Sequence, residues 1–225
     1  MKPTQALKIL FFACLLPAAL RAQPAKQINH QVQTWFSINT TARISSHWAL
    51  LADLHIRRNH FLAQNNFEFL RLGAQYSFEK NLSVAAGMGH MWLHSTQPGM
   101  KTVAQENRIY EQLVYQSGFG RIDIQQRLRL EQRWQQKLNG DLLTGDRKFT
   151  QRFRYLVSLF VPLSRNERVP RLNLSDEICL QAGREVVYNP FDQNRLFIGL
   201  RQKINSRFSF DTGYMLVVQQ KSSGY

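Results

Sequence analysis

The sequence predicts an all-β fold, an antiparallel transmembrane β-barrel of about 10–12 strands, and three observations lead to it. Apolar and polar residues alternate in a long series of segments, as side chains of a strand alternate between two faces. Many segments are longer than the average strand of about 5–6 residues, and they match the about 9–11 residues of a tilted membrane-crossing strand. Charged residues lie in mid-segment opposite the apolar rows, where a barrel has its lumen.

The apolar rows recur along almost the whole chain. Turn-forming or polar residues separate each row from the next, which is typical of successive antiparallel strands. No helical periodicity longer than two turns competes with them. In chain order the rows are Thr34–Ile38, Trp48–Ile56, Leu70–Phe78, Leu82–Met88, Ile109–Tyr115, Ile122–Leu130, Phe153–Val161, Leu172–Leu180, Leu196–Leu200 and Phe208–Val218.

The octet RLRLEQRW, residues 127–134, shows the alternation most clearly. One edge is charged, and leucines and a tryptophan form most of the other edge. In a transmembrane barrel the charged edge faces the lumen and the apolar edge faces lipid. The candidate lumen and anion-binding residues are Arg127, Arg129, Glu131, Arg133, Arg152, Arg154, Glu177 and Arg195.

Two interpretations of these charged residues stay open. In the first, Glu106, Glu131, Asp176 and Glu177 pair with the arginines and plug a narrow structural barrel, because buried charges have to be paired. In the second, the arginines outnumber the acids, and unpaired guanidiniums line a narrow anion-preferring pore. Glu111 falls on the lipid-facing parity, which predicts a β-bulge or a membrane-edge position for it.

The connections between the rows predict how the barrel is oriented. They alternate between short, as at 45–46, and long, as at 94–104 and 136–147, and barrels have short periplasmic turns and longer outer loops. On this scheme the segment 207–218 runs outward, and the polar tail after it lacks the alternation of a closing strand. We therefore expect the sequence to end before the closing strand.

The start of the chain predicts an export signal over residues 1–22. Lys2 and Lys8 accompany a twelve-residue apolar core, 9–20, and Ala22 offers a small residue for cleavage. A membrane-spanning helix needs about 20 apolar residues, so the apolar core over 9–20 is too short to be one. Cleavage leaves 23–225 as one outer-membrane barrel domain, in which Cys179 is the only cysteine, and lowers the formal charge of +14 by the three charges of Lys2, Lys8 and Arg21 to +11. We expect the cell outer membrane as its location.

The basic composition suggests particular partners. An exported barrel does not meet nucleic acid, so we expect none, and we expect contact with outer-membrane lipid, lipopolysaccharide and, during insertion, the barrel-assembly machinery. The arginines would attract small anions or acidic oligosaccharide. The histidines are scattered and no C-x-x-C, H-E-x-x-H or P-loop string occurs, so we predict no metal site and no cofactor.

The string GHMWLHSTQPG, 89–99, is the strongest catalytic candidate, because some outer-membrane barrels are lipid hydrolases with histidine and serine near the rim. A serine nucleophile needs an imidazole within hydrogen-bond reach, whereas His94 and Ser95 are neighbours and point to opposite faces of a strand. We predict that the protein is not an enzyme. An outer-membrane lipid hydrolase and a soluble exported β-sandwich binding protein remain as alternatives, since alternation alone also fits a sheet with one face in water.

An ordered series of strings covers almost the whole mature chain, from about Trp35 to Met215. The strings are ENRIYEQL (106–113), RLRLEQRW (127–134), RFRYLVSLFVPL (152–163), LNLSDEICLQAG (172–183), FDQNRLFIGL (191–200) and DTGYM (211–215). In this order they resemble the bacterial outer-membrane proteins grouped as domain of unknown function 2490. The resemblance implies a β-barrel in the outer membrane of Gram-negative bacteria, and it implies no activity. The missing closing strand departs from the family's pattern.

Overall fold

The computed structural model describes residues 29–97, 99–166, 168–186 and 190–220, and all strands belong to one compact unit. The expected signal, 1–22, lies outside these residues. No helix in the described part of the chain is long and apolar enough to cross a membrane. The strands are β1 (Gln33–Arg43), β2 (Trp48–Asn59), β3 (Gln64–Ser77), β4 (Leu82–His94), β5 (Val103–Phe119), β6 (Ile122–Asn139), β7 (Leu142–Pro162), β8 (Arg171–Ala182), β9 (Phe191–Lys203) and β10 (Ser209–Gln219).

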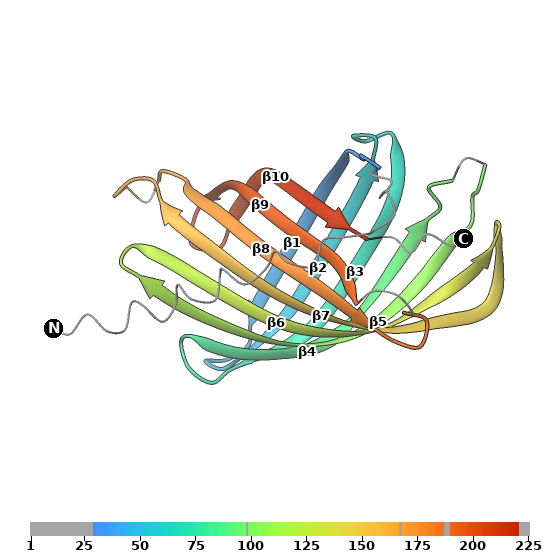
Figure 1. Cartoon of the computed structure of the whole chain (residues 1–225). Coiled ribbons are helices and arrows are strands. Elements are labelled where there is room, and N and C mark those ends of the chain that lie inside the picture. The colour runs from blue at the N-terminus through green and yellow to red at the C-terminus, as the bar shows by residue number, and fades with distance from the viewer. Residues whose placement is uncertain (1–28, 98, 167, 187–189, 221–225) are drawn as a thin grey trace, which may run out of the picture. The chain divides into compact units, whose positions relative to one another are not determined.

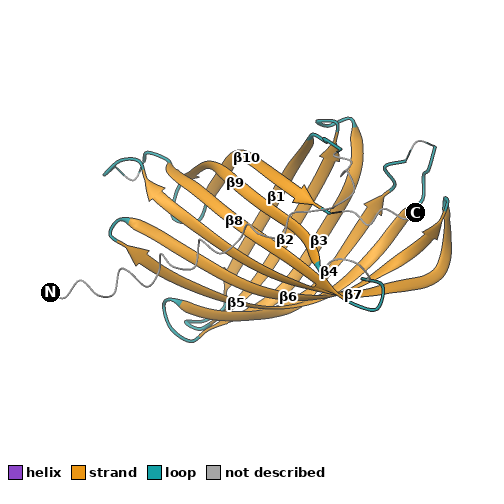
Figure 2. Ribbon diagram, in the orientation of Figure 1, coloured by secondary structure: helices purple, strands orange, loops and turns teal. Residues whose placement is uncertain are grey.

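The ten strands pair in chain order and form one antiparallel sheet (Figures 1 and 2). The sheet curls so that strands near its two edges approach each other. The guanidinium of Arg195 on β9 lies 5.4 Å from the ring centroid of Trp35 on β1. The strand order shows no β1–β10 pairing among the described residues, so the curled sheet is open along this seam. The predicted all-β antiparallel fold with ten strands is confirmed. The sandwich alternative is wrong, because a sandwich has two sheets.

The two faces of the sheet have the reverse of the usual polarity of a soluble protein. On β6, Leu128 and Leu130 are 39% and 37% exposed, whereas Arg129 and Glu131 are 4% and 1% exposed. The same alternation continues on β7, β8 and β9. We call the face toward which the sheet curls the inner face and the other the outer face. Polar residues therefore line the inner face, and apolar side chains cover most of the outer face.

Aromatic rings on the inner face lie directly on glycines of the same strand or of strands nearby in the sheet. A Cβ atom at Gly73 would come within 2.1 Å of the Tyr110 hydroxyl, and one at Gly87 would come within 2.8 Å of its ring. Phe197 occupies the corresponding space beside Gly199 and Gly213. The glycines let bulky rings fill the inside of the curl without pushing the strands apart.

The connections form two rims. One rim carries the connections 60–63, 95–102, 140–141 and 183–190, and we call it the hairpin rim because the long β6–β7 hairpin ends there. The opposite rim carries the connections 44–47, 78–81, 120–121, 163–170 and 204–208. The expected alternation of short and long connections is wrong, because 60–63 has four residues, as 44–47 and 78–81 have, and 163–170 is as long as 95–102. An even number of antiparallel strands also places the start of β1 and the end of β10 at the same rim, the hairpin rim.

The expected long loop at 136–147 is also absent. Strands β6 and β7 continue through this segment and meet at the two-residue turn Gly140-Asp141, where Asn139 pairs with Leu142. Gly140 has a φ of +59°, which glycine adopts without strain and which a tight hairpin requires at this position. The β6–β7 hairpin is thus longer than the sequence pattern indicates.

Candidate functional site

An ionic network occupies the middle of the inner face. The Glu131 carboxylate, 1% exposed, lies 2.8 Å from Nη1 of Arg154 and 3.4 Å from Nη1 of Arg108. Arg129 approaches the same carboxylate at 3.8 Å and donates two hydrogen bonds to the Gln112 side-chain oxygen. A buried carboxylate is stable only when it is paired in this way.

Glu177 on β8 is the second centre of the network. Its carboxylate lies 2.7 Å from Arg154, 2.6 Å from Arg127 and 3.1 Å from Arg195. Arg127 on β6 reaches across β7 to make this contact, so the network joins strands that do not pair directly. Arg154 contacts both Glu131 and Glu177 and thereby links the two centres.

A β-bulge adds a carboxylate that the alternation does not predict. Cys179 pairs with Gln193 and Leu180 with Phe191, which leaves Asp192 as the extra residue of β9. A bulge changes the direction of a side chain, and Asp192 is buried, with its carboxylate 2.5 Å from Nη2 of Arg152.

Further ion pairs extend the network along the inner face. Arg71 donates to Asp53 on the adjacent strand, with Nε 2.7 Å from the carboxylate, and Arg108 donates to Glu106 at 2.5 Å. Arg133 differs from these arginines, because within the described residues it makes one hydrogen bond, to the Gln181 side chain at 3.4 Å. No carboxylate in the described part of the chain forms an ion pair with it.

The structure places all eight predicted site residues on the inner face, where most of them are buried. Seven of them belong to the paired network, and Arg133 is the exception. The expected pairing of Asp176 inside the barrel is wrong. Asp176 lies on the outer face, where its carboxylate accepts a hydrogen bond from Asn194 at 2.6 Å, because adjacent residues of a strand face opposite sides and Glu177 takes the inner position.

Two aromatic groups border the apolar surface of the outer face. Near the opposite rim, Tyr76 contacts Trp48 and Phe78 with ring centroids 5.0 Å apart in both pairs. Toward the hairpin rim, Trp134 lies 5.2 Å from Phe149. The apolar residues of the outer face lie largely between these two levels.

Polar side chains lie on the outer face on the hairpin-rim side. His90 pairs with Asn107 at 2.7 Å, and Gln132 donates to Glu111 at 3.4 Å. The strand register around Glu111 is regular on both sides, so the bulge considered for this residue is absent. Glu111 pairs with Leu130, so it lies within the apolar surface, where its carboxylate accepts the hydrogen bond from Gln132.

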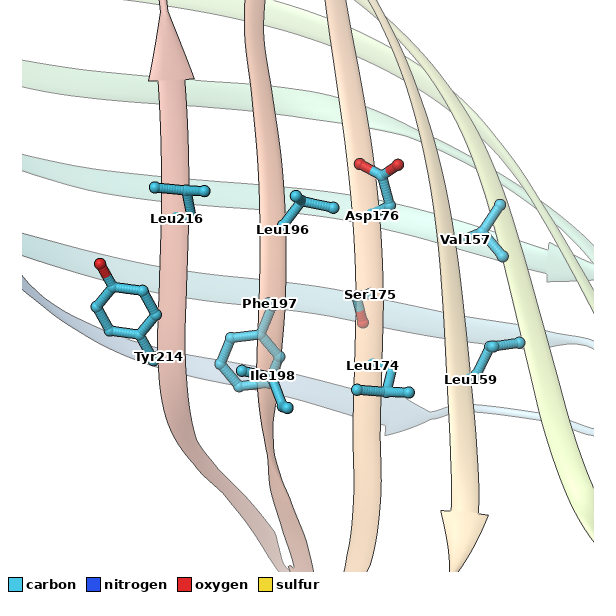
Figure 3. A pocket seen from close by; sticks show the side chains of 10 residues that line it. All are labelled: Val157, Leu159, Leu174, Ser175, Asp176, Leu196, Phe197, Ile198, Tyr214 and Leu216. Atoms are coloured by element: carbon cyan, nitrogen blue, oxygen red, sulfur yellow. The ribbon is translucent and has the colours of Figure 1, made fainter. Parts of the chain in front are cut away.

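The outer face of β7–β10 is hollowed by a shallow pocket of about 360 Å³ (Figure 3). Its walls are mostly aliphatic, and Asp176 and Tyr214 supply polar groups. Such a surface fits a hydrocarbon chain better than a polar ligand. The pocket is lined by Val157, Leu159, Leu174, Ser175, Asp176, Leu196, Phe197, Ile198, Tyr214 and Leu216.

Outside the apolar surface, the turn of the β6–β7 hairpin is tied to the neighbouring loop. The Asp141 carboxylate accepts hydrogen bonds from the backbone N–H groups of Thr102 at 2.7 Å and Lys101 at 3.0 Å. These bonds stabilise the ionised form, so they lower the pKa of Asp141 below its usual value of 3.8.

Comparison with known proteins identifies the family of the chain. Residues 32–225 match the model of the family described as protein of unknown function, DUF2490. The chain belongs to the DUF2490 family. The resemblance inferred from the six strings is thereby confirmed. No curated protein and no solved structure matches the chain.

For several inner-face residues of this DUF2490 protein, the alternation of the sequence does not predict the position or the contacts. Regular alternation along β9 would place Asp192 on the outer face, and the β-bulge turns it to the inner face. Ser37 lies 2.7 Å from Nδ1 of His55, a contact between two strands that no local motif indicates. Arg57 stacks on Trp35, with its guanidinium carbon 3.2 Å from the ring centroid. Alternating parity could have placed Arg57 and Trp35 on the inner face, but their contact depends on the β1–β2 register.

Proposed function

We propose that this DUF2490 protein is an integral outer-membrane β-barrel whose interior is closed by the Arg–carboxylate network. The observation that carries the proposal is the reversed polarity of the sheet, with Glu131 buried at 1% exposure between exposed Leu128 and Leu130. An exposed apolar surface of this extent is unfavourable in water and favourable in lipid. Buried charges on the other face are the pattern of a barrel lumen.

The dimensions of the apolar surface support the proposal. The outward-facing row of β2 runs from Trp48 to Ile56 and contains only apolar residues. This stretch of nine residues matches the about 9–11 residues that a tilted strand needs to cross a membrane. The apolar band of an outer-membrane barrel is about 25 Å tall, and aromatic residues are expected at both of its borders.

The pairing of the inner charges supports a closed interior over an open pore. Glu131 and Glu177 each contact three guanidiniums, and Asp192 and Asp53 each contact one. An aqueous pore would leave many of these groups to water, whereas here Arg129, Glu131 and Arg154 are buried. Small barrels commonly fill their interior with side chains in this manner.

A lipid hydrolase is the less favoured alternative. Ser95 accepts a hydrogen bond from the backbone N–H of Gln97, and His94 pairs with Glu68 at 2.6 Å, so neither side chain engages the other. Ser37 and His55 do form a serine–imidazole pair on the inner face. The His55 ring stacks on Phe69, and no carboxylate in the described residues hydrogen-bonds it to complete a triad.

The experiment is to refold the protein into vesicles and then measure planar-bilayer currents under a salt gradient. We expect heat-dependent gel migration, protease protection of the strands and no steady channel openings. Failure to insert into vesicles would contradict the membrane barrel. Steady openings with an anion-selective reversal potential would contradict the closed interior and favour the narrow anion-preferring pore. Turnover of phospholipid by the folded protein would favour the hydrolase.

A further inference from the structure

Arg57 is an inner-face arginine that the ionic network does not neutralise. No carboxylate in the described part of the chain forms an ion pair with it, and its guanidinium makes no hydrogen bond there. It is half-buried between two aromatic rings, with its guanidinium carbon 3.2 Å from the centroid of Trp35 and 4.5 Å from that of Phe67. Cation–π contacts hold the group in place but leave its N–H donors unused.

The charges around Arg57 are of the same sign as its own. Its strongest electrostatic neighbours are Arg195, Arg154, Arg108 and Arg152. The guanidinium of Arg195 lies over the same indole, 5.4 Å from its centroid, so Trp35 lies in contact with cations from both β2 and β9. Most of these other arginines already have carboxylate partners, whereas Arg57 has none.

A second donor without a partner lies next to Arg57 on the same face. Asn59 is fully buried, at 0% exposure, and follows two residues later on β2. Its side-chain oxygen accepts hydrogen bonds from Gln33 at 2.9 Å and Asn66 at 2.8 Å, but its amide nitrogen Nδ2 has no hydrogen-bond partner. A buried donor without a partner is unfavourable, and an acceptor bound from outside the chain would satisfy it.

We propose that Arg57, Asn59, Trp35 and Arg195 form an oxyanion-binding site at the hairpin rim of the interior. The ligand is a small solute that carries a carboxylate or phosphate group. The planar guanidinium of Arg57 supplies paired donors for such a group, Asn59 Nδ2 supplies another donor, and Arg195 adds positive charge. Trp35 and Phe67 fix the guanidinium so that little entropy is lost on binding.

The position of the site fits access from the hairpin rim. Arg57 is two residues from the end of β2, and Trp35 is two residues from the start of β1. This rim is above the level of Glu131 and Glu177, so an anion could enter without crossing the network. This inference rests on the proposed barrel in one respect, which is that the hairpin rim has to be open to water.

Arg58 gives a matched control for the test. It neighbours Arg57 in sequence but faces outward, where it pairs with Glu68 at 3.1 Å. Calorimetric titration of the folded protein in micelles, with sodium phosphate and sodium glucuronate at constant ionic strength, measures binding. We expect Arg57→Gln to weaken binding at least tenfold and Arg58→Gln to leave it unchanged. Equal binding by wild type and Arg57→Gln, or no binding of either probe to folded wild type, would overturn the site.

Chemical modification of the wild-type protein tests the site even if Arg57→Gln does not fold. Phenylglyoxal modifies accessible arginines, and peptide mass spectrometry reports Arg57 and Arg58 separately. The probe that binds should slow modification of Arg57 at least threefold and should not affect Arg58. Equal rates with and without the probe, or no modification of Arg57, would overturn the site. Vesicle insertion is measured independently, so a protein that inserts but binds neither probe refutes this inference alone.

Discussion

The Arg154 guanidinium contacts Glu131 at 2.8 Å and Glu177 at 2.7 Å, and so joins carboxylates from strands β6 and β8 on either side of β7. All three groups are buried while leucines on the same strands are exposed. The stability of the curled sheet therefore depends on charge pairing inside and on apolar contacts outside.

Removal of one charge from this group of Arg154, Glu131 and Glu177 should lower the free energy of unfolding. We expect Glu131→Gln to lower the free energy of unfolding by about 3–5 kcal/mol, because Arg154 and Arg108 lose their shared carboxylate in a buried setting. Urea unfolding in detergent micelles measures the change. Glu111→Gln on the outer face is the matched control and should have a much smaller effect. Equal losses in the two variants would show that the inner network is not the stabilising feature.

The contact between Tyr110 and the glycines of β3 and β4 should be sensitive to one methyl group. A Cβ at Gly87 would meet the Leu72 carbonyl oxygen at 2.1 Å and the Tyr110 ring at 2.8 Å. We expect Gly87→Ala to destabilise the sheet by roughly 1–3 kcal/mol through overpacking. Gly118→Ala is the control, since its Cβ would have only an ordinary contact at 3.6 Å. If both variants melt at the same temperature, the close packing is unimportant.

The energetic cost of a charged residue on the outer face should depend on where along the strand it lies. Leu128 lies within the apolar surface, and Gln132 lies in the polar group near the hairpin rim. In vesicles we expect Leu128→Arg to cost about 2–4 kcal/mol and Gln132→Arg about 0–1 kcal/mol, the values for midplane and interface positions. Folding titrations monitored by gel migration compare the two. Equal tolerance of both substitutions would contradict contact of this face with lipid.

The open seam should close in the membrane, where unpaired backbone groups are costly. Strands β1 and β10 are antiparallel across the seam, and Asn39, Met215 and Val217 share the inner face. In a Cys179→Ser background we expect Asn39→Cys to form a disulfide with a cysteine at Met215 or Val217, and not with one at the outward Leu216. Non-reducing gels of vesicle-inserted protein detect the product. Cross-linking only between molecules would indicate that the seam pairs with a second copy.

The tie between the hairpin turn and the 95–102 loop should depend on pH. The pKa of Asp141 is lowered in the folded protein, so its hydrogen bonds are fully formed above the usual value of 3.8 and are lost as pH falls through the lowered value. We expect the amides of Thr102 and Lys101 to be protected from hydrogen exchange at pH 5, with that protection lost as the pH falls below 3.8 and through the lowered pKa. Asp141→Asn, which removes the charge, should show reduced protection at pH 5. Unchanged protection in that variant would mean that other contacts hold the loop.

Alternation along the sequence is sufficient to place the strands and their two faces. Alternation of residue type is a local property, so RLRLEQRW placed Arg129 and Glu131 on one face and Leu128 and Leu130 on the other before any pairing was known. The eight candidate residues followed from the same parity. Family membership also came from ordered local strings.

Which charges meet depends on the tertiary structure. Arg127 reaches Glu177 across an intervening strand, and that contact depends on register and curl. Asp192 enters the interior through a bulge, which reverses its parity, and Gly140 lets two strands replace the expected loop. Arg57 has no carboxylate partner in the described residues, in which the inner-face carboxylates form their ion pairs with other arginines. Such outcomes depend on distances between strands remote in sequence, which alternation along one strand does not encode.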